Sequence, residues 1–360
     1  MPSRRRDPYA DPFQFADYTN EGRRHSRLKT ILAVVGIVAA ISVVAAGAAA
    51  LWLNSSLSNI RKIDVAISEE NRPAPQAESS GMNILLLGAD TGTARSGPGS
   101  SILKDAAAKT WPVGKYRSDA TMLVHIDDDR ERAYVVSIPR DSYVPLHDST
   151  GLQRESNKIN AALSLYGPSG AVATVEKFTD VRVDHLSMVD WDGFQDITDA
   201  LGGVAVTLPG QGRQTLDGAA ALAYVRERKR LPNGDFDRVK RQQNFLRAVT
   251  KELVDGGTLA NPIKLKRPLD AITRHMAVDD DWSDGDIRSL AFAMRDLKTK
   301  DLTFVTIPTT GTRSHPVAGS IVEPDEDRCA SLFEAMREDD MAQWIEENPR
   351  TKLGSPGSVD

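Results

Sequence analysis

Arg117, Asp119, Arg140 and Asp141 form two Arg–Asp pairs that lie far apart in the sequence. Arginine binds phosphate through two parallel hydrogen bonds and keeps its charge, and a carboxylate beside it could hold a metal ion or accept a proton. If the two pairs met in the fold, they could bind and activate a phosphate ester. Solvated ion pairs on the surface are the competing interpretation, and these four residues alone favour neither.

The segments around the two pairs predict a β-hairpin. Residues 120–126 and 133–138 are apolar and rich in β-forming residues, and the charged, turn-prone segment 127–132 joins them. Two strands with so short a link pair antiparallel, so the start of the first strand lies beside the end of the second. We therefore expect both Arg–Asp pairs at one edge of a sheet.

Composition excludes several classes of protein. The chain has 360 residues, 40% of them hydrophobic, which fits one large or two ordinary globular domains. Its net charge of -5 gives no basic field, and we expect no nucleic-acid partner. The single cysteine, Cys329, excludes an intrachain disulfide and a cysteine-rich zinc site. The six histidines show no ligand spacing, which argues against a histidine-based metal site.

Residues 31–53 contain no charge and are long enough to cross a hydrocarbon core about 30 Å thick. Arg23, Arg24, Arg27 and Lys29 precede them, and the next cation is Arg61. The positive-inside rule then predicts a cytoplasmic N-terminus and an extracytoplasmic remainder, a single-pass protein of the cell membrane. A cleaved signal peptide and a buried core helix are the alternatives to this signal anchor.

The rest of the chain alternates strand and helix signals, which predicts an α/β fold, an α-β-α sandwich with a mixed central sheet preceded by one transmembrane helix. The strands are expected at residues 83–87, 181–189, 204–208 and 302–307. The helices are expected at residues 158–167, 170–178, 193–201 (capped by Asp192), 218–223, 235–255, 284–297 and 327–337. Residues 224–228 read as an extended segment, in which Arg226 and Arg228 share one face.

These signals divide the chain into six parts. They are a disordered cytoplasmic tail (1–29), the membrane anchor (30–53), a stalk and linker (54–80), a catalytic domain (81–257), an extension packed on that domain (258–348) and a disordered tail (349–360).

Eight sequence blocks in a fixed order resemble the LytR–CpsA–Psr family. They are N-I-L-L-L-G-A-D (83–90), R-S-D-A-T-M-L-V (117–124), S-I-P-R-D (137–141), K-I-N-A-A (158–162), V-D-H-L-S-M-V-D-W-D-G-F (183–194), D-A-L-G-G-V (199–204), L-D-G-A-A-A-L-A-Y-V-R-E-R (216–228) and D-F-D-R-V-K-R-Q-Q (235–243). One block would be a weak signal, but eight in order behind a single membrane anchor are specific.

The resemblance implies a phosphotransferase of the cell wall. Such an enzyme moves an anionic glycopolymer (teichoic acid, capsule or arabinogalactan type) from a polyprenyl-pyrophosphate carrier to peptidoglycan and forms a phosphodiester bond. The implied cofactor is Mg²⁺ or Mn²⁺, and the membrane is a further partner. A polyprenyl-pyrophosphate phosphatase and a non-catalytic, membrane-anchored regulator of envelope biogenesis are the alternatives.

The resemblance also assigns roles to individual residues. Asp119, Arg140 and Asp141 would be catalytic, with Asp119 ranked above Asp141 as the base, and Asp90 and Asp119 would hold the metal. Phe245 would line a groove for the lipid, between residues 236–253 and 194–201. The pyrophosphate would be bound by Arg117, Arg140, Arg226, Arg228, Arg238 and Gln242.

Some features keep a plain structural interpretation or depart from the family. Lys158 and Asn160 are expected to close a loop and cap a helix rather than to touch substrate. Gln243 is structural or functional with equal weight, and His185 is expected to be structural. The family often has an arginine soon after Asp90; here the nearest is Arg95, so either Arg95 takes that place or the contact is missing.

Overall fold

The computed structural model of the chain describes residues 55–75, 81–90, 102–108, 111–208, 210–227, 230–254 and 261–358. The expected tail and anchor, Arg95 and Arg228 lie outside these residues, as does the side chain of Asp90. In the part of the chain that is described, no helix has both the length and the apolar character needed to cross a membrane.

The predicted hairpin is confirmed. It consists of β3 (Arg117–Ile126) and β4 (Ala133–Ile138), which pair antiparallel from Thr121 opposite Ile138 to Ile126 opposite Ala133. All six residues of β4 are buried, so this strand lies in the interior of the fold.

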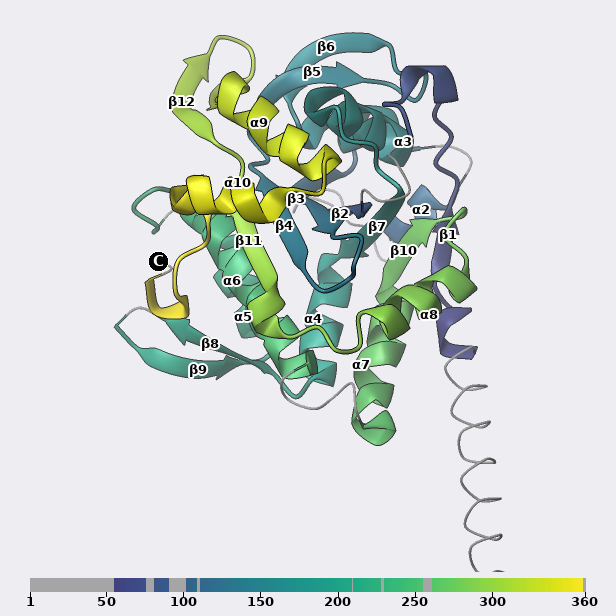
Figure 1. Cartoon of the computed structure of the whole chain (residues 1–360), viewed down its shortest axis with the longest axis vertical. Coiled ribbons are helices and arrows are strands. Elements are labelled where there is room, and N and C mark those ends of the chain that lie inside the picture. The colour runs from purple at the N-terminus through teal and green to yellow at the C-terminus, as the bar shows by residue number, and fades with distance from the viewer. Residues whose placement is uncertain are drawn as a thin grey trace, which may run out of the picture. The chain divides into compact units, whose positions relative to one another are not determined.

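A seven-stranded mixed sheet contains this hairpin, as expected for an α/β sandwich (Figure 1). The strand order is β1-β10-β7-β2-β3-β4-β11. The pairs β1–β10, β7–β2 and β4–β11 are parallel, and the other neighbours are antiparallel. The remaining strands are β1 (Arg61–Ile63), β2 (Met82–Asp90), β7 (His185–Asp190), β10 (Met276–Asp279) and β11 (Leu302–Thr306).

Helices cover both faces of the sheet (Figure 1). One face packs against α2 (Ile102–Ala106), α3 (Asn160–Thr179), α9 (Glu326–Arg337) and α10 (Met341–Glu347). The other face packs against α4 (Trp191–Ala200), α5 (Gly218–Arg226), α6 (Asp235–Val254) and α7 (Pro262–His275), and α8 (Asp284–Ala293) lies at one end. Alternate side chains of β2 point to opposite faces of the sheet. Leu85 and Leu87 pack in the hydrophobic core on the first face, and Leu86 packs against the core on the second.

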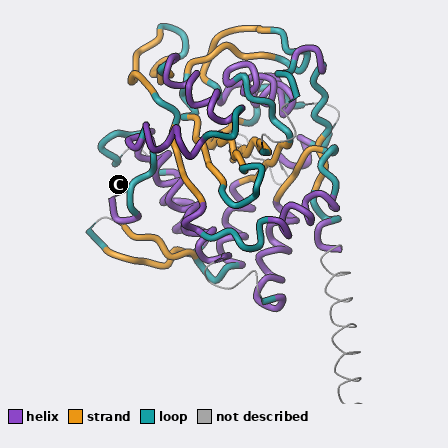
Figure 2. The backbone as a smooth tube through the Cα atoms, in the orientation of Figure 1, coloured by secondary structure: helices purple, strands orange, loops and turns teal. Residues whose placement is uncertain are grey.

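Three two-stranded ribbons lie outside the central sheet (Figure 2). They pair β5 (Tyr143–His147) with β6 (Gln153–Lys158), β8 (Val204–Leu208) with β9 (Gly212–Leu216), and β12 (Thr309–His315) with β13 (Gly319–Pro324). The expected strand at residues 204–208 therefore exists as β8, but it packs its apolar side chains on α5 and α6.

The expected boundaries at residues 80 and 257 do not separate independent parts. Strand β1 comes from the expected stalk, and β10 and β11 come from the expected extension, yet all three belong to the central sheet. Residues 349–358, for which we expected disorder, form two short 3-10 turns, and Leu353 N donates a hydrogen bond to Phe304 O of β11 (2.8 Å).

One local expectation was confirmed and two were wrong in detail. The two helices expected at 158–167 and 170–178 both lie within α3, where Gly167, whose φ of 70° is not helical, separates them. The cap of α4 is Asp190, which accepts a hydrogen bond from Gly193 N, and not Asp192. Residues 224–226 continue α5 to Arg226 and are not extended, because the alanine-rich start of this segment propagates the helix.

A buried ion pair attaches the segment before β2 to the domain. The Arg72 guanidinium donates to Glu176 of α3 (Nη2 to Oε1, 2.7 Å) and to Val183 O (2.6 Å). Glu176 is 1% exposed and also accepts a hydrogen bond from Val183 N. Removing one partner from such a pair leaves an uncompensated buried charge, which is strongly destabilising.

We predict that Arg72→Ala lowers the free energy of unfolding by about 3–5 kcal/mol, because Glu176 would lose its counter-charge. Urea denaturation followed by circular dichroism measures the change. The matched control is Arg313→Ala, which breaks the exposed pair of Arg313 with Glu323 and should cost under about 1 kcal/mol. Equal losses in the two variants would contradict this account of Arg72.

Candidate functional site

A β-bulge places Asp119 at the edge of the sheet. In the β2–β3 pairing, Gly88 lies opposite Ala120 and Ala89 lies opposite Ser118, so Asp119 has no partner residue in β2. Ser118 Oγ donates a hydrogen bond across the extra residue to Ala120 O (2.8 Å). A bulge of this kind turns a side chain out of the regular alternation, and such bulges are common beside active sites.

Arg140 holds three carboxylates together. Its Nη1 donates to Asp119 Oδ1 (2.5 Å), and its Nε lies 3.9 Å from Asp141 Oδ1 and 3.6 Å from Asp235 Oδ1. Lys158 Nζ lies 3.3 Å from Asp141 Oδ1. Burial lowers the pKa of Arg140, but the charge and hydrogen bond of Asp119 outweigh it and leave the pKa above its ordinary value.

The first turn of α6 adds a second guanidinium. Arg238 Nη2 lies 2.6 Å from Asp235 Oδ1, and the Arg238 side chain is only 5% exposed. Burial lowers the pKa of Arg238 from its ordinary value despite the charge of Asp235, although an arginine stays protonated in a protein. Among the described residues, Arg140 Nε and Arg238 Nε are buried and donate no hydrogen bond, while Arg238 Nη2 is paired with Asp235. Buried donors of this kind indicate a site made for an acceptor that is brought by a ligand.

Polar contacts fix the position of α6 against the sheet. Gln243 Nε2 donates to Ser137 Oγ of β4 (2.8 Å) and to Val305 O of β11 (2.8 Å). At the start of the helix, Asn233 N donates to the buried Asp237 (2.8 Å). Because Gln243 joins α6 to β4, the residues after β4 and the first turn of α6 keep a fixed separation.

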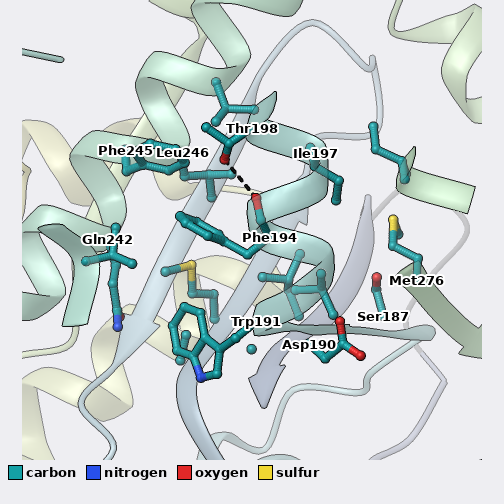
Figure 3. A pocket seen from close by; sticks show the side chains of 18 residues that line it. Ser187, Asp190, Trp191, Phe194, Ile197, Thr198, Gln242, Phe245, Leu246 and Met276 are labelled. Carbon is teal, nitrogen blue, oxygen red and sulfur yellow. Dashed lines mark hydrogen bonds between the residues drawn. The ribbon is translucent and has the colours of Figure 1, made fainter. Parts of the chain in front are cut away.

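An apolar cavity of about 240 Å³ lies between the sheet, α4 and α6. On α6, Gln242 and Phe245 line it, one and nearly two turns beyond Arg238. Figure 3 shows Phe194 and Phe245 in its lining, with Gln242 on one side and Asp190 and Met276 on the other. The ring centroids of Phe194 and Phe245 are 4.8 Å apart. Leu246 and Val249 of α6 line this cavity as well.

Arg226 lies near the cavity rather than on an extended strand. Its guanidinium carbon is 5.4 Å from the ring centre of Trp191, and Trp191 lines the cavity. Asp190, which caps α4, lines it too, and burial raises the pKa of Asp190. An arginine over an aromatic ring keeps its charge while its flat face is covered.

The structure therefore brings together Asp119, Arg140, Asp141 and Arg238, and it connects them through α6 to Gln242 and Phe245. Arg117 is exposed at the start of β3, directly opposite Asp90 in the strand register. The place of Arg117 and Arg226 at the site stays a prediction.

Two members of the cluster were missed by sequence reasoning. Asp235 lies three residues before Arg238 on the same helix face, within the block D-F-D-R, so its spacing could have revealed it. Lys158, which we expected to close a loop, pairs with Asp141, while Asn160 N closes that loop by donating to Arg140 O (3.2 Å).

Comparisons with known proteins agree with the fold and the motifs. The sequence profile of the LytR_cpsA_psr family matches residues 51–338, which extends beyond the region 81–257 in which the blocks were recognised. The cell wall biosynthesis protein LcpA of Corynebacterium glutamicum is 33% identical over 275 residues, which cover 65% of this chain and 51% of that protein. The chain thus spans about half the length of LcpA.

Two further proteins are similar. A polyisoprenyl-teichoic acid–peptidoglycan teichoic acid transferase, TagU of Bacillus cereus, is 32% identical over 62% of this chain and 71% of its own length. The crystal structure of TagV from Bacillus subtilis superposes with a TM-score of 0.57 and 26% identity, and covers 73% of this chain and 98% of that one. With four-fifths of its length matched by the family profile, the chain belongs to the LytR–CpsA–Psr family.

Proposed function

We propose that the chain is a phosphotransferase that moves an anionic cell-wall glycopolymer from a polyprenyl-pyrophosphate carrier to peptidoglycan. A hydroxyl of peptidoglycan attacks the phosphorus that bears the glycopolymer. The bond from this phosphorus to the bridging oxygen breaks, and polyprenyl phosphate leaves with that oxygen. The hydroxyl proton passes to a carboxylate, for which Asp119 is our first choice and Asp141 the second. The product is a phosphodiester. The direction of transfer, from a polyisoprenyl-linked polymer to peptidoglycan, is the one in the name of TagU.

The observation that carries this proposal is a pair of buried guanidinium groups, each of which has an N–H donor without a hydrogen-bond acceptor. Arg140 Nε and Arg238 Nε are shielded from water and make no hydrogen bond within the described chain. A pyrophosphate supplies oxygens for such donors, and its charge increases as the leaving group departs. Donors fixed before the reaction stabilise that charge without having to reorganise.

The apolar cavity supports a lipid carrier as the other half of the substrate. The stripe Arg238, Gln242 and Phe245 on α6 leads from the charged cluster into the cavity. A polyprenyl pyrophosphate has the same sequence of properties, with a charged head followed by an apolar chain. We propose that the head binds at Arg140, Arg238 and, through their positions in the family motifs, Arg117, Arg226 and Arg228, while the prenyl chain contacts Phe245.

We further propose that Asp90 and Asp119 hold Mg²⁺ or Mn²⁺. The strand register places Asp90 opposite Arg117, close to the bulge that turns out Asp119, and both residues offer only oxygen ligands. Magnesium prefers such ligands in small number, completed by substrate phosphates and water. The bound ion would supply charge neutralisation at the phosphates, while Arg140 positions Asp119.

The location of the reaction is part of the proposal. The apolar segment 31–53 would anchor the chain in the cell membrane with its N-terminus in the cytoplasm and the catalytic domain outside. A lipid-linked substrate and peptidoglycan would then both be within reach of the site.

We predict that Arg140→Ala lowers the rate of glycopolymer transfer at least about 100-fold, because it removes a fixed donor to the transition state. The assay supplies the full chain with lipid-linked glycopolymer and peptidoglycan and measures polymer bound to the wall. Arg295→Ala, which removes an exposed arginine paired with Asp296, is the control and should keep full activity. Unchanged transfer by Arg140→Ala would show that catalysis does not take place at this site. Release of inorganic phosphate without attachment of polymer would show a phosphatase instead.

We also predict that a chelator stops the transfer and that added Mg²⁺ restores it. In Asp90→Asn the Mg²⁺ concentration for half-maximal rate should rise about tenfold or more, because one of the two carboxylate ligands is lost. Titration of the transfer rate with Mg²⁺ measures the shift, and Asp192→Asn, on α4, is the control. Full activity of the wild type in excess chelator would rule out the metal.

A further inference from the structure

A second polar cluster lies at the opposite end of the β3–β4 hairpin from Arg140. It consists of His125 in β3, Asp127 in the hairpin turn and Asp339 between α9 and α10. One ligand atom from each residue lies within 4.8 Å of the others. In the described part of the chain, this is the one group of His, Cys, Asp and Glu side chains with such spacing.

The histidine ring is oriented by a polar neighbour. His125 is fully buried, and its Nδ1 lies 2.8 Å from Asn83 Oδ1 of β2. An amide oxygen only accepts hydrogen bonds, so Nδ1 donates to Asn83. On the other side of the ring, Nε2 faces the two carboxylates and shares a hydrogen bond with Asp339 Oδ1 (2.9 Å). A metal ion that binds here would take the place of the proton in that bond, since metal binding releases protons from its ligands. Histidine ligands of metals are commonly held in this way, with one nitrogen bonded to an oxygen and the other facing the ion.

Each carboxylate is held through one oxygen and turns the other towards His125. Asp127 Oδ2 pairs with Arg132 Nε (2.9 Å), and Asp339 Oδ2 accepts from Asp128 N (3.2 Å). The remaining oxygens, Asp127 Oδ1 and Asp339 Oδ1, lie 3.9 and 2.9 Å from His125 Nε2. Three potential ligand atoms therefore converge. The second polar atom of each of these side chains is held by a contact with the protein.

Asp127 gives the independent indication of a ligand. The residue is 3% exposed, and its Oδ1 accepts no hydrogen bond within the described chain. Burial, with the charge of Asp339, raises the pKa of Asp127 to about 6. A buried carboxylate oxygen without a partner is costly unless something positive compensates it.

The backbone leaves room for this convergence. Gly81 has a φ of 76°, and a Cβ there would approach Asp339 Oδ1 and the His125 ring to 3.0 Å and Ile126 O to 2.3 Å. Asp339 also has a left-handed φ, of 57°, which turns its side chain from the end of α9 towards the hairpin. Its side chain is 19% exposed, which leaves a path for an ion from solvent.

We propose that His125, Asp127 and Asp339 form a binding site for a divalent transition-metal ion of the zinc type, distinct from the proposed Mg²⁺ site. An imidazole nitrogen together with carboxylates favours such ions over Mg²⁺ or Ca²⁺, which prefer oxygen ligands alone. Small rotations of the two aspartates would bring the three atoms to the usual distances of about 2.0–2.2 Å. The ion would join the turn of the hairpin to the α9–α10 segment, so its role is structural.

The test uses the full chain without an added histidine tag, treated with chelator and then dialysed against Zn²⁺. We expect the wild type to bind Zn²⁺ and to gain thermal stability from it, because an ion that binds only the folded state stabilises that state. In Asp339→Asn the dissociation constant should rise at least about tenfold, since a ligand is lost from a partly exposed position that tolerates an amide. Metal content after dialysis and the melting temperature measure the two effects.

The matched control is Asp128→Asn, which makes the same change of charge at an exposed position in the same turn. It should bind Zn²⁺ as the wild type does. If Asp339→Asn keeps the wild-type dissociation constant and stability gain, the ion binds elsewhere and the proposal is wrong. If the wild type binds no Zn²⁺, the cluster is only a hydrogen-bonded network. Neither result depends on the transfer assay, so failure here leaves the proposed function untouched.

Discussion

The candidate site depends on keeping two guanidinium groups close together and away from water. Arg140 and Arg238 repel each other, and burial removes the solvent that would screen them. Asp119, Asp141 and Asp235 compensate that charge, and each comes from a different local element: a bulge, a turn and a helix start. The arrangement persists only if those elements hold their positions, which explains why Gln243 joins α6 to two strands at once.

Compensation by carboxylates changes the electrostatic picture that the sequence suggests. Counted along the chain, the arginines assigned to the site outnumber its acids, which predicts an excess of positive charge for binding a pyrophosphate. In the fold, Asp235 adds a further carboxylate beside Arg140, and Lys158 forms an ion pair with Asp141. The guanidinium groups described there are largely neutralised as charges, but the Nε donors of Arg140 and Arg238 remain without a hydrogen-bond acceptor. Selectivity for phosphate would then come from the directions of N–H groups more than from net charge.

Sequence patterns correctly predicted the elements that form through interactions between neighbouring residues. The hairpin, β2 and α6 follow from alternation, turn residues and helical periodicity, and all were predicted. The pairing partners were not, because a short strand such as β1 or β10 has no distinctive sequence and forms only where a neighbour accepts its hydrogen bonds. The bulge at Asp119 has the same origin, since an extra residue exists only relative to β2. His125 and Asp127 meet Asp339 through the fold alone, so ligand spacing in the sequence could not reveal them.

The order of strands in the sheet has a consequence for how the protein is made. Strand β1 is synthesised early, but its partner β10 lies in the last quarter of the chain, as does β11 at the opposite edge. During synthesis the hairpin and α3 can form from nearby residues, whereas both outer strands of the sheet wait for the end of translation. Until then β4 and β7 expose unpaired edges, which are prone to wrong pairing. A chain that stops near residue 257 would thus lack both borders of its sheet, even though it contains every residue assigned to catalysis.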